Sequence, residues 1–446
     1  MLNDLPWLRP FRFCTIVLLC LLAAACSTLP DVSKLSASLP PLATPAAGRA
    51  IGPARLDALA AMEEAVTGSP LVKGNKVSLL FDGPQTMTAM IAAIGQARST
   101  INFETYIFDQ DQLGQRFADI LIEKQRAGVQ VNIIYDSVGS IGAPAEFFER
   151  MRAAGIRLVE FNPVNPLKRF GRWQLNHRDH RKILVVDGKI GFTGGVNISA
   201  AYANSSLFRS RLRSSAGPVG WRDTHVQIEG PAVASLQLLF LQTWSSQHAE
   251  DLPDLDYFPK LEQAGDKTVH VLGSQPDGDY SLYKAYILAI QQARNSIHIT
   301  TPYFAPDRQL ADALIAAARR GVDVSLILPS VTDSGLVLHA GQSFYTQLLS
   351  AGIRIYQLQV SVLHAKTAVI DGSWSTVGSA NMDIRSFLHN YEANVIVIDD
   401  QFGHEMERAF REDVRGSQQI TLEQWRQRPF SDRVKEWAAR SLGYWL

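Results

Sequence analysis

The sequence predicts an α/β protein of two similar halves, each a mixed β-sheet flanked by helices, related by a pseudo-two-fold axis. Three observations predict this class. Short segments of the first half recur in the second at nearly constant spacing, helical and strand periods alternate within each copy, and a matching polar motif follows each copy. We expect the functional site at the seam between the halves.

The recurring segments keep their order along the chain. Residues 93–101 match 289–297, residues 126–131 match 319–324, and residues 154–157 match 351–354, at offsets of 196, 193 and 197. Any α/β protein contains similar helix–strand fragments, but unrelated fragments would not keep this spacing. We therefore expect the two halves to pack face to face about the pseudo-two-fold axis, with a cleft between them.

The first copy shows how its elements alternate. Residues 87–97 carry apolar side chains at helical spacing, and residues 101–108 alternate in polarity as a strand does. A second helical stretch over 113–126 stops at Gly128, and residues 129–135 form an apolar strand. Such alternation predicts a sheet covered by helices.

The first 26 residues are typical of an export signal. Arginines precede an apolar-biased run over 13–25, which is shorter than the roughly 20 residues of a spanning helix. Small residues then lead to Cys26, which resembles the lipidated cysteine of bacterial lipoproteins. Leu22 and Ala23 depart from the preferred pattern, so an uncleaved anchor and an ordinary cleaved signal stay open.

The lipoprotein resemblance implies a location in the bacterial cell envelope. Ser27 after the cysteine favours the periplasmic face of the outer membrane, with the inner membrane as the alternative. The following segment, rich in Pro, Ala and Ser, predicts a flexible tether. The chain is thus divided into a signal at 1–26, a tether at 27–70, a first half at 71–250 and a second half at 251–446.

Composition narrows the classes of function. The 446 residues carry 43 Lys and Arg against 43 Asp and Glu, and this balance disfavours a dedicated nucleic-acid binder. All three cysteines lie within the first 26 residues, which excludes a disulfide framework and a cysteine-ligated metal site from the rest of the chain. We expect neither a metal nor a cofactor.

Each half carries one copy of the polar motif. The first copy contains His180, Lys182, Asp187 and Asn197, and the second contains His364, Lys366, Asp371 and Asn381. In both copies the histidine and the asparagine are 17 residues apart. On a strand the histidine and lysine project to the same side, while Arg181 faces away. An apolar run then enters the core and an Asp-Gly pair makes a turn.

Two imidazoles, two ammonium groups and two amides suit a phosphodiester. Each lysine supplies a compact positive charge, and backbone N–H groups near Gly378 can complete a cradle for the phosphate. One histidine can attack phosphorus as a neutral nucleophile while the other protonates the leaving alkoxide. His177 is expected in a solvated loop, and His225 either near the cleft or in the core.

These motifs resemble the two-motif branch of the phospholipase D superfamily, and their surroundings resemble bacterial cardiolipin synthases. The resemblance rests on residues 378–387, 390–394, 221–225, 228–231 and 103–106. It implies a phospholipase D-like fold and a phosphatidyltransferase that acts at a membrane surface. Phosphatidylglycerol is the expected substrate and cardiolipin the expected product, formed through a phosphohistidine intermediate.

The resemblance also implies a role for each site residue. His180 is the expected nucleophile and His364 the expected general acid. The catalytic set also includes Lys182, Asp187, Lys366 and Asp371, with phosphate bound by Asn197, Ser379 and Asn381 and the histidines oriented by Asp223 and Glu392. Asp187 and Asp371 are expected to serve the turns more than the phosphate itself.

Three alternatives remain at this point. Water as the acceptor would make the protein a phospholipase D, and the basic loops at 168–173 and 209–213 leave a nuclease open, although they also suit anionic headgroups. A non-catalytic binding module would require both motifs to be vestigial. The tail from 433 to the end is expected to be an amphipathic helix that docks on the core, with an interfacial anchor as the alternative.

Overall fold

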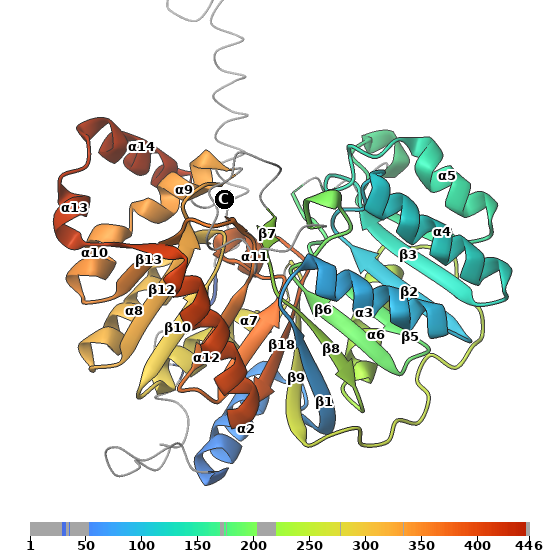
Figure 1. Ribbon diagram of the computed structural model, residues 1–446, viewed down its shortest axis with the longest axis horizontal. Helices are drawn as coiled ribbons and strands as arrows, with labels where there is room; N and C mark the ends of the chain where they lie inside the picture. Colours follow the sequence, from blue (N-terminus) through green and yellow to red (C-terminus); the bar gives the residue numbers. More distant parts are fainter. Residues whose placement is uncertain are drawn as a thin grey trace, which may run out of the picture.

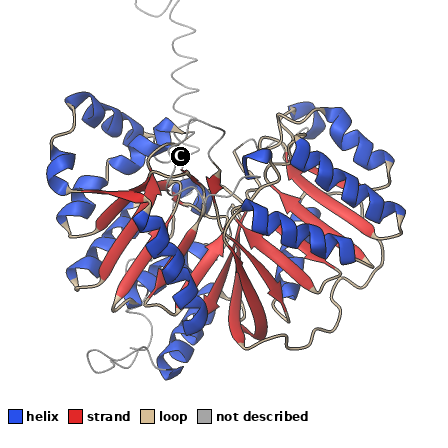
Figure 2. Cartoon of the chain, viewed as in Figure 1, coloured by secondary structure: helices blue, strands red, loops and turns tan. Residues whose placement is uncertain are grey.

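A single large sheet organises the molecule. The computed structural model describes residues 29–32, 35, 53–169, 174, 176–202, 220–276, 278–332 and 334–442. Within these ranges a 15-stranded mixed sheet runs through both halves, and helices cover its faces (Figures 1 and 2). The predicted signal segment and Cys26 lie outside the described residues.

The first half contributes seven strands to this sheet. From the seam outward they are β1 (Val72–Leu80), β8 (His225–Glu229), β6 (Ile190–Gly194), β5 (Ile183–Val186), β2 (Thr100–Thr105), β3 (Gln130–Asp136) and β4 (Arg157–Phe161). Its helices are α3 (Gly83–Gln96), α4 (Gln112–Arg126), α5 (Ala145–Ala153) and α6 (Val233–Ser246). Strands β2, β3 and β4 are parallel, as the intervening helices predict.

The second half repeats this strand order from the same seam. Its strands are β9 (Lys267–Ser274), β18 (Glu392–Ile398), β16 (Trp374–Gly378), β15 (Thr367–Ile370), β10 (Ser296–Thr300), β12 (Asp323–Pro329) and β13 (Arg354–Leu358), with β19 (Ser417–Ile420) added at the edge. Its helices are α7 (Ser281–Gln292), α8 (Arg308–Arg319), α9 (Gly335–Gln342), α10 (Tyr345–Ser350), α11 (Ile384–Leu388), α12 (Asp400–Arg415), α13 (Leu422–Arg426) and α14 (Phe430–Ser441). The predicted two-half α/β fold is confirmed.

Equivalent helices begin and end with the same local chemistry. The Asp111 carboxylate accepts hydrogen bonds from two N–H groups in the first turn of α4, and Asp307 does the same for α8. Gly128 and Gly321 follow these helices with φ of +92° and +91°. This left-handed conformation favours glycine and ends both helices before the next strand begins.

The halves meet along an edge as well as face to face. Strands β1 and β9 pair antiparallel and join the two sheets into one. A valine-rich core, which includes Val185, Val226, Val377 and Val395, then lies between the two sheets beside this seam. The expectation of face-to-face packing alone was incomplete, because the paired edges at the seam also satisfy backbone groups that would otherwise need water.

The expected tether at 27–70 is wrong for its last part. Residues Pro53–Thr67 form helix α2, which packs against α7 and places Leu59 and Ala60 in the core of the second half. The buried Glu63 carboxylate accepts hydrogen bonds from Trp374 Nε1 and His270 Nδ1, each at 2.9 Å. Further upstream, the Val32 N–H donates to Gln309 Oε1 on α8.

Candidate active site

Two short parallel contacts cross the seam and bring the motif histidines to carboxylates of the opposite half. Strand β7 (Trp221–Arg222) pairs with β14 (Val362–Leu363), directly before Asp223 and His364. An isolated bridge between Asp179 and Tyr391 lies in the same way directly before His180 and Glu392. The same arrangement thus occurs twice, and the pseudo-two-fold axis relates the two copies.

Each histidine is hydrogen-bonded through Nδ1 to its cross-half carboxylate. His180 Nδ1 lies 3.0 Å from Glu392 Oε2, and His364 Nδ1 lies 2.7 Å from Asp223 Oδ2. Both carboxylates are fully buried. An Nδ1–H group donated to a carboxylate leaves Nε2 as the reactive atom and stabilises the imidazolium form. This geometry fits the predicted orienting role of Asp223 and Glu392.

The lysine of each motif lies beside the histidine of the same motif. Lys182 Nζ donates to the His180 carbonyl at 2.6 Å, and Lys366 Nζ donates to the His364 carbonyl at 2.6 Å. Lys366 Nζ also lies 3.0 Å from the ring nitrogens of His364. Burial lowers the pKa of Lys182 to about 7, against the attraction of Glu392.

Both histidines line one cavity of about 300 Å³. Other residues that line it are Tyr106, Arg178, Asn197, Trp221, Asn381 and Arg385. Tyr106 packs edge-on against His180 with ring centroids 5.0 Å apart, and Trp221 lies 5.1 Å from His364. The cavity therefore has two imidazoles, cationic side chains and aromatic walls, which suit a phosphodiester with an apolar remainder.

The histidines are neutral in this buried setting. Burial lowers the pKa of His180 to about 4, although Glu392 opposes the shift. For His364 burial and the charge of Lys366 together lower the pKa to about 4, against Asp223. A neutral imidazole can attack phosphorus, whereas a general acid needs a proton, so an anionic ligand must raise one of these pKa values.

The two motif asparagines are Asn197 and Asn381. Both line the cavity. Asn197 accepts the Ile107 N–H and donates to the Tyr202 hydroxyl at 3.0 Å, so it also fixes the cavity wall. The buried Oδ1 of Asn381 has no hydrogen-bond partner among the described residues.

Ser379 differs from its predicted role in binding phosphate. Its buried hydroxyl donates to Glu392 Oε2 at 2.5 Å and accepts the Ala393 N–H. It therefore lies behind Glu392 and holds this carboxylate. In the first half a Cβ at Gly195 would come 2.1 Å from Asp223 Oδ1. The shorter Asp223 thus lies against Gly195 in the first half, and the longer Glu392 lies against Ser379 in the second half.

The motif aspartates Asp187 and Asp371 lie away from the cavity, at the opposite end of strands β5 and β15. Asp187 has φ of +53° in its turn, and its carboxylate accepts N–H groups of Arg98, Ser99 and Thr100. Asp371 makes the equivalent bonds to residues 294–296. They therefore do not belong to the catalytic set. They have the turn role that the sequence also predicts.

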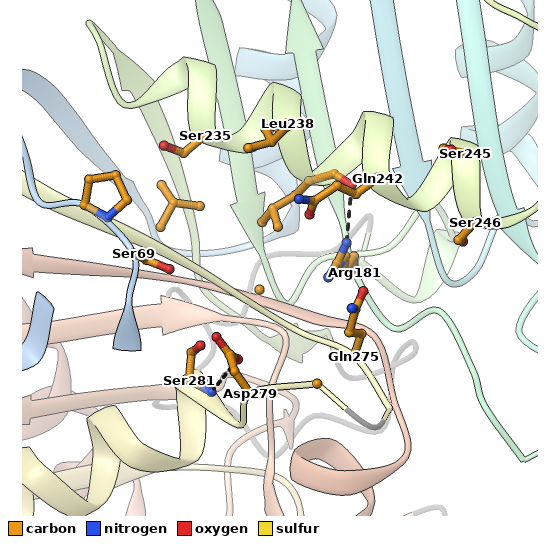
Figure 3. Close-up of a pocket in the computed structure, with 15 residues that line it drawn as sticks. Ser69, Arg181, Ser235, Leu238, Gln242, Ser245, Ser246, Gln275, Asp279 and Ser281 are labelled. Carbon is orange, nitrogen blue, oxygen red and sulfur yellow. Dashed lines mark hydrogen bonds between the residues drawn. The ribbon is translucent and has the colours of Figure 1, made fainter. Parts of the chain in front are cut away.

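Arg181 faces away from the active site, as predicted. Its guanidinium donates to Thr243 Oγ1, to the Ser274 carbonyl and to the Glu392 carbonyl, and so ties the two halves together. Figure 3 shows it at a second cavity, of about 750 Å³, between α6 and the segment around Gln275. The strand expected at His180 and Lys182 begins only at Ile183, and residues 180–182 lie outside it.

His225 lies in the core rather than at the cavity. It is fully buried on β8, neither ring nitrogen has a described partner, and burial lowers its pKa to about 3. The aromatic walls were missed by sequence reasoning, although Tyr106 and Trp221 stand in segments that carried the family resemblance. Tyr202, whose hydroxyl lies 3.1 Å from His364 Nδ1, has no signal in the sequence pattern.

The described ranges contain neither a cluster of metal ligands nor a helix suited to span a membrane. No group of three or more His, Cys, Asp or Glu side chains there could hold a metal ion. No helix in the same part of the chain is long and apolar enough to cross a bilayer.

Comparison with known proteins identifies the family. The family model described as "Cardiolipin synthase, PLD-like domain" matches residues 90–207 and 286–414, one match in each half. The chain belongs to this family. A cardiolipin synthase of Geobacillus kaustophilus is 37% identical over 376 residues, which cover 84% of this chain and 73% of that protein. A probable cardiolipin synthase of Bacillus subtilis is 36% identical over 82% of this chain and 71% of its own length. The predicted family, and with it an enzyme of the phospholipase D superfamily, is confirmed.

Solved structures support the PLD-like fold. A phosphatidylserine synthase of Haemophilus influenzae Rd KW20 superposes with a TM-score of 0.65 at 14% identity, covering 88% of this chain and all of that one. A polyphosphate kinase of Porphyromonas gingivalis gives a TM-score of 0.52 at 13% identity over 85% of this chain and 54% of its own. At these identities the likeness concerns the fold alone.

Proposed function

We propose that this protein is a phosphatidyltransferase that makes cardiolipin from two molecules of phosphatidylglycerol. The observation that carries the proposal is the shared cavity, in which two histidines face one space and each is oriented by a carboxylate of the other half. Membership of the cardiolipin synthase family supports the choice of substrate.

In the first step, neutral His180 attacks the phosphorus of phosphatidylglycerol through Nε2. A P–N bond forms, the P–O bond to the headgroup glycerol breaks, and His364 gives its proton to the leaving alkoxide. The substrate phosphate raises the pKa of His364, which supplies this proton. Lys182, Lys366, Asn197 and Asn381 stabilise the charge on the phosphate oxygens.

In the second step, a headgroup hydroxyl of another phosphatidylglycerol attacks the phosphohistidine. His364 takes the hydroxyl proton, the P–N bond breaks, and cardiolipin leaves with His180 neutral again. This step requires that the cavity exclude water, because attack by water would yield phosphatidic acid instead. Each turnover therefore releases one glycerol.

Lipid product analysis tests this proposal. Purified full-length protein is incubated with phosphatidylglycerol vesicles, and the products are separated and identified by mass spectrometry. We expect cardiolipin and free glycerol in equal amounts. Phosphatidic acid alone would identify a hydrolase, and cleavage of single-stranded DNA without lipid turnover would identify a nuclease.

Histidine variants provide the controls. His180→Ala and His364→Ala should each abolish turnover while retaining the native circular dichroism spectrum. His404→Ala, an exposed histidine on α12, should leave turnover unchanged. Near-normal activity in either motif variant would contradict the division of roles given above.

The membrane surface is the second partner that we infer, because the substrates are bilayer lipids. The location inferred from the lipoprotein-like signal is the cell envelope, with an anchor at Cys26. Replacing Cys26 by Ala and fractionating cells should move the protein out of the outer-membrane fraction. Unchanged fractionation would contradict the lipid anchor.

A further inference from the structure

Exposed apolar side chains gather around the cavity from both halves. We name this group the apolar rim, and its members are Ile141, Leu167, Val331, Phe430, Val434 and Trp437, with exposures between 47% and 81%. Soluble surfaces usually carry such side chains singly, so a cluster indicates a surface that contacts something apolar.

In the second half, helix α9 connects the rim to the cavity. Its residue Val337 lines the cavity, and its Ala340 packs against Ala439 of α14 in a small buried cluster. The opposite face of α14 carries Phe430, Val434 and Trp437 at helical spacing. This helix is therefore docked on the protein through one stripe and exposes a second apolar stripe. Figure 1 shows α14 and α9 together at the upper edge of the second half.

In the first half, the exposed Ile141 and Leu167 follow residues that are hydrogen-bonded to the cavity wall. The loop that carries Ile141 is fixed to the cavity wall, because Ser140 Oγ donates to the Tyr106 carbonyl at 3.2 Å. Leu167 follows Asn162, whose carbonyl accepts a hydrogen bond from Arg178 at 2.9 Å. Tyr106 and Arg178 both line the cavity.

The clustering is specific to this side of the molecule. Of the eleven large apolar side chains exposed in the described ranges, six form the rim, Leu336 lies on α9, Leu442 directly follows α14, and three lie elsewhere. One of these three, Phe258, belongs to a loop that packs against the Asp187–Gly188 turn, at the end of β5 away from the active site.

The segment that contains the second-half part of the rim has a small excess of positive charge, although Arg428 and Lys435 are ion-paired with Glu436 and Asp432. Residues 422–441, which contain α13 and α14, hold five Lys and Arg against three Asp and Glu, although the whole chain is neutral. Basic side chains beside exposed Trp and Phe are the usual composition of a helix that lies in the interface of an anionic bilayer. Lipid is therefore favoured over a protein partner for this surface.

We propose that the apolar rim is the surface on which this protein sits on an anionic phospholipid bilayer, with the cavity facing the lipid. The inference rests on the proposed function, because it assumes that the substrates come from that bilayer. It assigns Phe430, Val434 and Trp437 to the headgroup and upper acyl region, with Ile141 and Leu167 on the opposite side of the cavity.

Site-specific labelling tests the orientation, and the cysteine-free body makes it simple. The full-length chain with its three native cysteines changed to Ser receives either Trp437→Cys or Phe258→Cys, and each is labelled with bimane. Bound to phosphatidylglycerol vesicles that contain brominated lipid, the label at 437 should lose at least half of its fluorescence. The label at 258 should be unaffected.

A second measurement separates binding to the bilayer from catalysis. In the triple variant Phe430→Ser, Val434→Ser, Trp437→Ser, turnover on vesicles should fall at least tenfold. Turnover of monomeric short-chain phosphatidylglycerol should stay unchanged. Phe258→Ser should change neither. Equal quenching at both labels, no quenching at 437, or a 437 label shielded by self-association without lipid would each overturn the proposal. Quenching at 437 without any transferase activity would instead refute the proposed function and keep the surface.

Discussion

Each motif histidine depends on a carboxylate from the other half of the chain. His180 pairs with Glu392 and His364 with Asp223, at 3.0 and 2.7 Å. A carboxylate in this place fixes the tautomer and stabilises the imidazolium that forms during catalysis. An amide of the same shape would keep the packing but lose the charge and would favour the wrong tautomer.

We therefore expect Glu392→Gln and Asp223→Asn each to lower kcat by about 10²- to 10⁴-fold with little change in KM. Turnover of short-chain phosphatidylglycerol measures the effect, and thermal unfolding shows whether the variants fold. A loss confined to KM would mean that these carboxylates act on substrate binding instead.

Asp187→Asn is the matched carboxylate control. The Asp187 carboxylate accepts the N–H groups of residues 98–100, just before and at the start of β2, so the variant should keep kcat within about twofold and lose about 1 kcal/mol of stability. A collapse of kcat at full stability would return this residue to the catalytic set.

The pKa values of the two histidines predict a proton uptake on binding. Burial lowers both to about 4, so both imidazoles are neutral at pH 7 in the empty site. An anion between them favours the charged form and raises the pKa values, so a histidine goes from neutral to protonated. Calorimetry of sulfate binding at pH 7, in buffers of different ionisation enthalpy, should show uptake approaching one proton.

The same titration with His364→Ala should show much less uptake, because the expected general acid is gone. Zero uptake in the unmodified protein, or release of a proton, would contradict the neutral resting state of the site.

At the scale of elements, helix α2 joins the N-terminal segment to the second half. Its Glu63 carboxylate is buried between Trp374 on β16 and His270 on β9. The sequence predicted a tether here because Ala-rich and Pro-rich residues dominate the stretch before the first repeat. Only the surrounding strands supply the two donors that make a buried glutamate favourable.

Removing this carboxylate should destabilise the protein without touching the cavity. Glu63→Ala leaves the Trp374 and His270 donors without an acceptor and should lower the free energy of unfolding by about 1–3 kcal/mol. Urea denaturation measures this change. Glu64→Ala, the exposed neighbour, should stay within about 0.5 kcal/mol of the unmodified protein. Equal effects of the two changes would contradict the buried role of Glu63.

The alternation of helices and strands was predicted well, whereas the short contacts across the seam were not. Helical and strand periods are local, so the paired elements of 93–135 and 289–328 could be assigned from spacing. The two-residue strands β7 and β14 are too short for any period to show, yet they place Asp223 beside His364. Their pairing depends on elements 141 residues apart in the chain.

For the whole molecule, the pseudo-two-fold axis puts a complete site inside one chain. Both histidines line one cavity, and both cross-half carboxylates come from the same polypeptide. Chains that each lack one histidine therefore cannot complete one another, unless they exchange halves.

We expect an equimolar mixture of His180→Ala and His364→Ala chains to be as inactive as either variant alone. The mixture is assayed for cardiolipin formation after incubation under native conditions. Recovered activity would show that the working site forms between two chains rather than within one.

The sequence by itself determined the repeat, the α/β class, the two motifs and the family, because each depends on residue types at fixed local spacing. The tertiary structure decided which carboxylate serves which histidine, that Ser379 holds Glu392, which N–H groups the Asp187 and Asp371 carboxylates bind, and that α2 belongs to the core. These facts depend on distances between residues far apart in the chain. Spacing along one half carries no information about which side chain the other half brings within hydrogen-bond reach.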